Sequence, residues 1–195
     1  MLERKSSIIS GISEITLKKR RRTKNKNTPK FDVDIYLKKQ LGIDITQVDG
    51  IDSLSGLNIL GEMGSDFSKW PTRKQFLSWL NLVPNNKTSG GKLISSHLMK
   101  KKNSAGQIFR KSGSCLWKSK EPLGDYYRKQ RAKNGGKAAA IATGNKLASI
   151  VYTMVTKQIE YDKSILVRMK RNSQQKRLNN LRKKVAHIQK ELALV

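Results

Sequence analysis

Apolar residues recur at helical spacing along most of the chain. Leucine occupies every third position between 54 and 60, which predicts an amphipathic helix in this stretch. Asp52 or Ser53 is placed to cap the start of the helix, and Gly64 is placed to end it. The pattern therefore indicates one well-bounded helix in the first half of the chain.

A second helix is predicted within residues 65–84. Pro71 suits its first turn, and Pro84 stops it. Trp70 and Trp79 belong to the same stretch, and we assign both to the core or to packing between helices, with stacking on a nucleobase as the alternative. The apolar face of this helix is predicted to consist of Phe76, Leu77 and Leu80.

Two further helices are predicted in the second half of the chain. Residues 105–117 carry an apolar face, and residues 137–162 carry the longest apolar stripe in the sequence. Gly135 and Gly136 should break the chain between this stripe and the segment 122–134. We find no alternating run typical of a strand and no internal repeat. The sequence therefore predicts a mainly α fold with a compact helical domain.

Both ends of the chain are basic and are expected to extend as helices from that domain. We divide the chain into the end of a helical connector with a basic linker (1–30), a compact domain (31–162) and a basic C-terminal helix (163–195). The linker is either a solvated tether or a phosphate contact. The C-terminal helix has a short heptad seam, which is suited to dimerise or to dock on its own domain. The seam consists of Leu178, Leu181, Val185, Ile188 and Leu192.

The charge of the chain points to a polyanionic partner. Its 195 residues include 41 Lys and Arg but 14 Asp and Glu, which gives a net charge of +27. Such an excess opposes a compact state by self-repulsion unless a polyanion neutralises it. Nucleic acid is therefore the expected partner. Charge alone does not separate a DNA-processing enzyme from a ribosomal or chromatin-type structural protein.

A few residue types exclude other classes of protein. Cys115 is the single cysteine, so no internal disulfide can form, which agrees with a reducing intracellular environment. His97 and His187 have no Cys or His partner at metal-binding spacing, so no metal site is predicted. No apolar run is long enough to span a membrane, and the start lacks a secretory signal. We expect a cytoplasmic protein without membrane contact.

The stretch "TSGGK" is the main candidate for chemistry. Ser89 precedes Gly90 and Gly91, and Lys92 follows them. Glycines let the backbone approach another group closely, and a lysine beside such a turn suits a phosphate. Ser89 is therefore either a small turn residue or the residue whose hydroxyl oxygen reacts.

A second phosphate site is suggested around Gly50. An apolar residue, a glycine, an isoleucine and then a helix resemble a helix-hairpin-helix module, in which backbone N–H groups hold a DNA phosphate. Asp52 stands where the common pattern has its second glycine, and an acid there opposes phosphate. An ordinary helix turn is the alternative interpretation.

The order of these segments resembles the carboxy-terminal domain of the DEDD-type insertion-sequence transposases, which are RNA-bridged serine recombinases of bacterial mobile elements. The resemblance extends over about residues 28–195, and it depends on the order and spacing of motifs rather than on any single one. The matching motifs lie at 42–46, 48–51, 61–66, 76–84 and 89–92.

The resemblance implies that Ser89 is the nucleophile that attacks a DNA phosphodiester. It further implies that Gly90, Gly91 and Lys92 stabilise the phosphoryl oxygens, and that Arg110 clamps the same phosphate. DNA, a guide RNA, and a second copy or a full-length transposase are the implied partners. The alternatives are a catalytically inactive nucleic-acid-binding remnant that regulates the full-length enzyme, and a structural RNA-packing protein.

The chain departs from the family in one large respect. Family members have an amino-terminal RuvC-like domain whose four carboxylates bind magnesium, and nothing in this sequence matches it. We therefore expect a truncated or split transposase that has no cofactor of its own and is inactive alone, with magnesium entering only with the missing domain.

Overall fold

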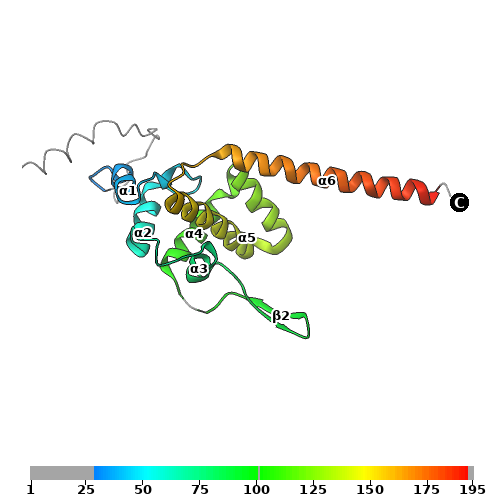
Figure 1. Ribbon diagram of the computed structural model, residues 1–195, viewed down its shortest axis with the longest axis horizontal. Helices are drawn as coiled ribbons and strands as arrows, with labels where there is room; N and C mark the ends of the chain where they lie inside the picture. The colour runs from blue at the N-terminus through cyan, green and yellow to red at the C-terminus, as the bar shows by residue number, and fades with distance from the viewer. Residues whose placement is uncertain (1–28, 101, 193–195) are drawn as a thin grey trace, which may run out of the picture.

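The computed structural model describes residues 29–100 and 102–192, and it confirms a mainly α, compact fold (Figure 1). Residues 1–28, which make up nearly all of the predicted connector and basic linker, lie outside the described residues. In chain order the elements are α1 (Val33–Leu41), η2 (Ile45–Gln47), α2 (Ser53–Met63), α3 (Arg73–Trp79), β1 (Asn85–Ser89), β2 (Lys92–His97), α4 (Ser104–Cys115), η3 (Leu116–Lys118), α5 (Pro122–Lys157) and α6 (Lys163–Leu192).

The predicted caps of α2 are confirmed. Asp52 is the N-cap, and its carboxylate accepts a hydrogen bond from the Ser55 backbone N–H at 2.9 Å. Gly64 ends the helix with φ +75°, a conformation that glycine adopts without steric penalty. Local sequence chemistry thus fixes both ends of this helix.

Helix α3 is shorter than the sequence predicted. Thr72 and Gln75 form a capping box, with the Gln75 N–H donating to the Thr72 hydroxyl and the Thr72 N–H donating to the Gln75 side chain. This arrangement places Pro71 just outside the helix instead of in its first turn. The helix ends at Trp79, so Pro84 does not stop it. Asn81, with φ +53°, turns the chain first.

An aromatic cluster forms one end of the core. Trp70 is 8% exposed, and its ring centre lies 4.7 Å from that of Trp79 and 5.1 Å from that of Phe76. The Tyr152 hydroxyl on α5 donates to the Trp70 carbonyl oxygen at 2.7 Å. The assignment of both tryptophans to packing is confirmed, because each lies within or against the core cluster.

Helices α4 and α5 cross closely at two glycines. A Cβ on Gly113 would lie 2.9 Å from the backbone nitrogen of Gly144, and a Cβ on Gly144 would lie 3.0 Å from the Phe109 carbonyl. Neither position has room for a side chain without a shift of the opposing backbone. The crossing brings the buried Phe109 and Leu147 into one core.

The predicted break at the glycine pair appears as a kink within α5. Gly135 has φ +80° and ψ 170°, and helical structure continues on both sides of it. The first arm of α5 (122–134) and its second arm (136–157) therefore run in different directions (Figure 1).

Helix α6 runs away from the helical body toward the C-terminal end (Figure 1). It is tied to the body at its start, where the Lys163 ammonium lies 3.0 Å from the Asp49 carboxylate and 3.4 Å from that of Glu121. The described seam residues Leu178, Leu181, Val185 and Ile188 are 43–54% exposed. The seam does not dock on its own domain, and dimerisation stays a prediction.

Among the described residues, no helix is both long and apolar enough to cross a membrane.

Candidate nucleic-acid interface

The stretch around Ser89 forms a β-hairpin, although it has no alternating run typical of a strand. β1 and β2 pair antiparallel, with Ser89 opposite Lys92. Gly90 and Gly91 have φ +55° and +73°, which is the two-residue turn with both central residues left-handed that hairpins favour. The two glycines are therefore required by the turn, in addition to any contact with phosphate.

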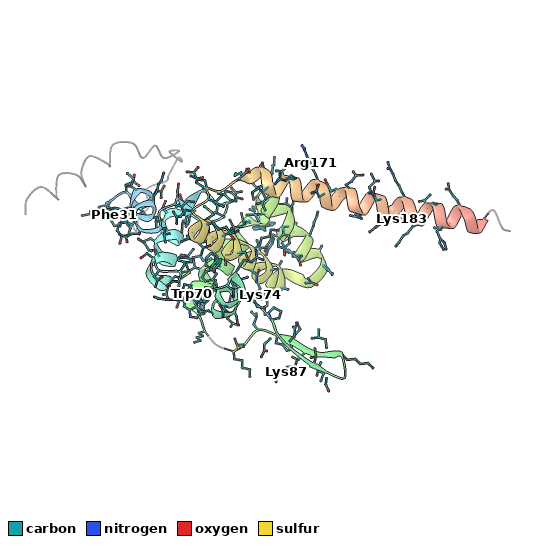
Figure 2. All side chains as sticks on the ribbon, in the orientation of Figure 1. Phe31, Trp70, Lys74, Lys87, Arg171 and Lys183 are labelled. Atoms are coloured by element: carbon teal, nitrogen blue, oxygen red, sulfur yellow. The ribbon has the colours of Figure 1, made fainter. Side chains whose placement is uncertain are left out.

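The hairpin projects from the helical body (Figure 1), and its residues are exposed on both faces. Leu93 is 57% exposed and Ile94 is 69% exposed. This exposure explains the lack of alternation between apolar and polar residues in both strands, since neither face of the hairpin is buried. Lys87, labelled in Figure 2, and Lys92 contribute positive charge along the hairpin.

Two asparagines anchor the base of the hairpin to the body. The Asn81 side-chain amide donates to the Met99 carbonyl oxygen at 2.8 Å, which joins the segment before β1 to the segment after β2. The Asn103 amide donates to the Trp79 carbonyl oxygen at 3.0 Å. The hairpin thus has a fixed base and a free tip, with Ser89 at the tip.

Of the predicted site residues outside the hairpin, the structure does not bring Arg110 to Ser89. His97 pairs with Asn85 at the opposite end of the hairpin. Arg110 lies half-buried on α4 in the body, where its Nε donates to the Gly106 carbonyl oxygen at 3.2 Å. In this arrangement the hairpin tip carries Ser89, the two glycines and Lys92 without Arg110.

Gly50 lies in a packed turn instead of an open one. A Cβ on Gly50 would lie 3.0 Å from the Ser112 carbonyl oxygen and 3.0 Å from Leu116. Its φ of +90° is also a conformation that favours glycine. The turn before α2 therefore has a packing reason for this glycine, and its role in phosphate binding stays a prediction.

A basic aromatic patch on η3 and α5 was not anticipated from the sequence. Trp117 is 46% exposed, with the Lys118 ammonium 5.0 Å and the Arg131 guanidinium 5.8 Å from its ring centre. Arg128 donates to the Trp117 carbonyl oxygen at 3.0 Å. Exposed aromatic rings beside cations suit bases and phosphates. The pairing with Arg131 arises from the fold, because η3 packs on α5.

Over the described residues, no cluster of three or more His, Cys, Asp or Glu side chains could hold a metal ion.

These features define a basic helical protein with an exposed, serine-tipped hairpin. Residues 44–107 match the family model described as Transposase IS116/IS110/IS902 family. This stretch is similar to a transposase domain of that type and supports a role in insertion-sequence transposition, which implies interaction with DNA. A comparison with curated proteins gave no match.

Proposed function

We propose that this chain is the DNA-binding and nucleophile-bearing part of an insertion-sequence transposase, and that the hairpin carries Ser89 to the scissile phosphate. The observation that carries the proposal is the position of the hairpin. It lies wholly inside the transposase match at 44–107, and its tip extends away from the body. A projecting arm can reach a phosphodiester that the rigid body cannot approach.

The chemistry at the tip is a phosphoryl transfer. The Ser89 hydroxyl oxygen attacks the phosphorus, an Oγ–P bond forms, and the bond from phosphorus to one sugar oxygen breaks. The departing sugar oxygen receives a proton, and the serine loses one. Lys92, opposite Ser89 in the strand register, supplies positive charge next to the phosphoryl oxygens.

A serine hydroxyl is a weak nucleophile until a base activates it. The hairpin itself places no histidine or carboxylate beside Ser89, since His97 lies at the other end. We therefore propose that another domain or polypeptide completes the site, and that a guide RNA or full-length transposase belongs to the working assembly.

Covalent capture tests this role. The purified chain is mixed with element-end DNA and with the amino-terminal half of a complete relative, and a denaturation-resistant protein–DNA band is sought. Ser89→Ala should abolish the band. Ser96→Ala is the matched control, because Ser96 is also exposed on the hairpin, and it should retain the band. A band that survives Ser89→Ala, or no band from a complex that still shifts DNA, overturns the nucleophile role.

DNA binding is tested separately by salt titration in a native gel shift. Contacts to phosphates release counterions, so the affinity should fall steeply and linearly with the logarithm of salt concentration. Affinity that does not depend on salt, or no affinity at all, overturns the binding role whatever the capture experiment shows.

A second candidate function, pairing with a full-length transposase as a regulator, is favoured by the exposed seam of α6. Apolar side chains at heptad spacing with 43–54% exposure are typical of a helix that packs on another helix. Light scattering should give a dimer mass for the chain and a monomer mass for a Leu181→Lys, Val185→Lys variant. A monomeric wild-type chain that also fails to associate with a full-length relative removes this candidate.

A further inference from the structure

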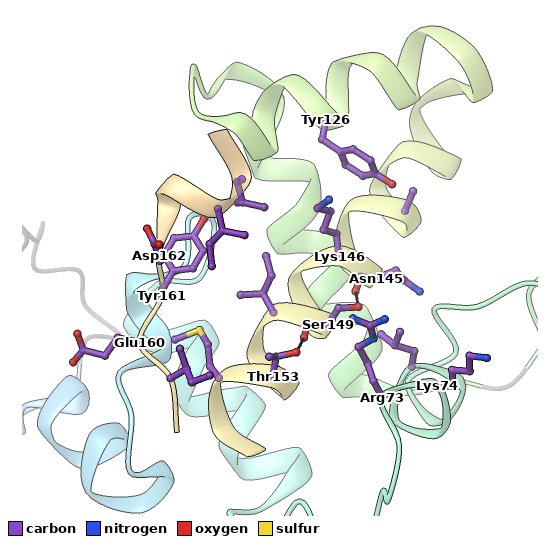
Figure 3. Close-up of a pocket in the computed structure, with 17 residues that line it drawn as sticks. Arg73, Lys74, Tyr126, Asn145, Lys146, Ser149, Thr153, Glu160, Tyr161 and Asp162 are labelled. Atoms are coloured by element: carbon purple, nitrogen blue, oxygen red, sulfur yellow. Dashed lines mark hydrogen bonds between the residues drawn. The ribbon is translucent and has the colours of Figure 1, made fainter. Parts of the chain in front are cut away.

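A groove of about 480 Å³ lies between α3, the second arm of α5 and the start of α6 (Figure 3). Its volume falls within the range of roughly 300–1,000 Å³ that small-molecule and cofactor sites occupy. None of the residues proposed above for phosphoryl transfer lines it. The groove is therefore a second candidate site on the same chain.

The floor of the groove is apolar. Leu77 from α3, Met154 from α5 and Leu166 from α6 are buried beneath it, and Ile150 is half-buried beside them. Ile165 also lines the groove and is 39% exposed. Such a floor suits the flat face of an aromatic ring better than it suits a phosphate.

Three cations stand on one side of the groove. Arg73 and Lys74 come from α3 and Lys146 comes from α5, and no ion pair to an acid of the described chain is found for any of them. Lys146 lies 5.1 Å from the ring centre of Tyr126. Burial raises the pKa of Tyr126.

The acids of the groove lie on the other side. Figure 3 shows Glu160 and Asp162 across from Arg73 and Lys74. Asp162 is engaged locally, where its carboxylate accepts from the Ser164 N–H at 2.7 Å and from the Ser164 hydroxyl at 2.6 Å. An anionic group in the groove is therefore directed toward the side of Arg73, Lys74 and Lys146.

The α5 wall offers hydrogen-bond acceptors. The Ser149 hydroxyl donates to the Asn145 carbonyl oxygen at 2.8 Å, and the Thr153 hydroxyl donates to the Ser149 carbonyl oxygen at 2.9 Å. Each hydroxyl uses its proton inside the helix and presents oxygen lone pairs to the groove. A ligand edge that carries an N–H donor fits this wall.

We propose that the groove binds an unstacked nucleotide of single-stranded DNA. The base lies on the apolar floor beside Tyr126, and its phosphate lies among Arg73, Lys74 and Lys146. The combination of an apolar floor, an adjacent aromatic ring and a cationic side matches the two halves of a nucleotide. This assignment rests on the proposed DNA binding. It adds a specific site at which the chain holds a base outside the base stack.

The test compares two DNA probes and two charge variants. One probe is a duplex with a single unpaired 2-aminopurine, and the other is the same duplex fully paired. The groove variant is Arg73→Gln, Lys74→Gln, Lys146→Gln. The control is Lys39→Gln, Lys69→Gln, Lys111→Gln, which removes the same charge at three exposed lysines that do not line the groove. Melting curves verify that both variants fold.

For the unpaired probe, the groove variant should lose roughly tenfold more affinity than the control, in line with the contribution of one stacked base. For the fully paired duplex, the groove variant and the control variant should lose the same amount of affinity. Ser149→Leu, which fills the groove without a change of charge, should reproduce the selective loss. Equal behaviour of the two charge variants on the unpaired probe overturns the groove assignment while DNA binding stands.

Two other results are also decisive. If the wild-type chain binds neither probe, the proposed function itself fails. If a single-stranded RNA of the same sequence binds more tightly than the DNA, and its binding alone depends on the groove residues, the assignment to DNA is overturned in favour of RNA.

Discussion

The Lys146 ammonium lies 5.1 Å from the centre of the Tyr126 ring, although the two residues stand on opposite arms of the kinked helix α5. The contact joins the two arms next to the groove. Its geometry depends on Gly135, whose φ of +80° reverses the direction of the helix. The kink thus brings the Tyr126 ring and the Lys146 ammonium together. In a straight helix these two residues would be far apart.

Substitution at Gly135 should weaken this arrangement. Gly135→Ala forces a side chain into a positive-φ, extended conformation that is nearly restricted to glycine, and it should cost roughly 1–3 kcal/mol of folding free energy. Gly136→Ala is the control, because its neighbourhood is also open but its φ is not positive, and it should stabilise by up to about 1 kcal/mol. Urea denaturation measures both. Equal effects of the two substitutions would show that the kink does not require glycine.

The Ser149 and Thr153 hydroxyls on the α5 side of the groove predict that it binds cytosine more tightly than thymine. Cytosine has an amino donor at the position where thymine has a carbonyl acceptor. Oligo(dC) should therefore bind more tightly than oligo(dT) of equal length, and Ser149→Ala, Thr153→Ala should reduce the difference. Fluorescence anisotropy at fixed salt measures the two affinities. Tighter binding of oligo(dT) would contradict the orientation of the two hydroxyls.

The base of the hairpin should depend on Asn81. Asn81→Ala removes the hydrogen bond to the Met99 carbonyl and should cost about 1–3 kcal/mol, because a partly buried acceptor loses its donor. The variant should also be cut more rapidly by protease within the hairpin. Asn86→Ala, at an exposed hairpin position, should change stability by less than about 0.5 kcal/mol. Similar losses for both would mean that Asn81 does not anchor the arm.

The attachment of α6 should weaken at high pH. The hydrogen bond to Asp49 is the main cause that raises the pKa of Lys163 in the folded chain. Its contribution is complete below the unfolded value of about 10.4 and is lost as the pH rises through the folded value. Asp49→Asn should remove this pH dependence. Hydrogen exchange of the first α6 turns, followed from pH 8 upward, measures the effect, and an unchanged profile in Asp49→Asn would contradict it.

The helices could be predicted because their signals are local. Asp52 and Gly64 cap α2 through their own side-chain and backbone chemistry, and leucine spacing marks its apolar face. The start of α3 differs from the prediction based on Pro71, because reciprocal hydrogen bonds between Thr72 and Gln75 set it two residues later. Here a capping box, visible in the sequence as Thr and Gln three apart, was the stronger signal.

The hairpin and the groove could not be predicted in the same way. Both strands are exposed on each face, so burial imposes no alternation on them, and "SGGK" indicates a turn without indicating a strand on either side of it. The groove forms only where α3, α5 and α6 pack together. Arg73 and Lys146 are far apart in the sequence, and no local pattern predicts that they line the same groove. Both line the groove because α3 packs against α5.

Helix α6 is longer than one helical repeat of B-DNA. At 1.5 Å per residue its 30 residues span about 45 Å, which exceeds the roughly 34 Å helical repeat of B-DNA. Its exposed cations from Lys163 to Lys184, among them Arg171 and Lys183 (Figure 2), are spread over about 32 Å, close to one turn of a duplex. A duplex lying along this helix would meet the chain at more than one groove crossing, so the length of bound DNA protected from nuclease should shorten in discrete steps as α6 is shortened from its end.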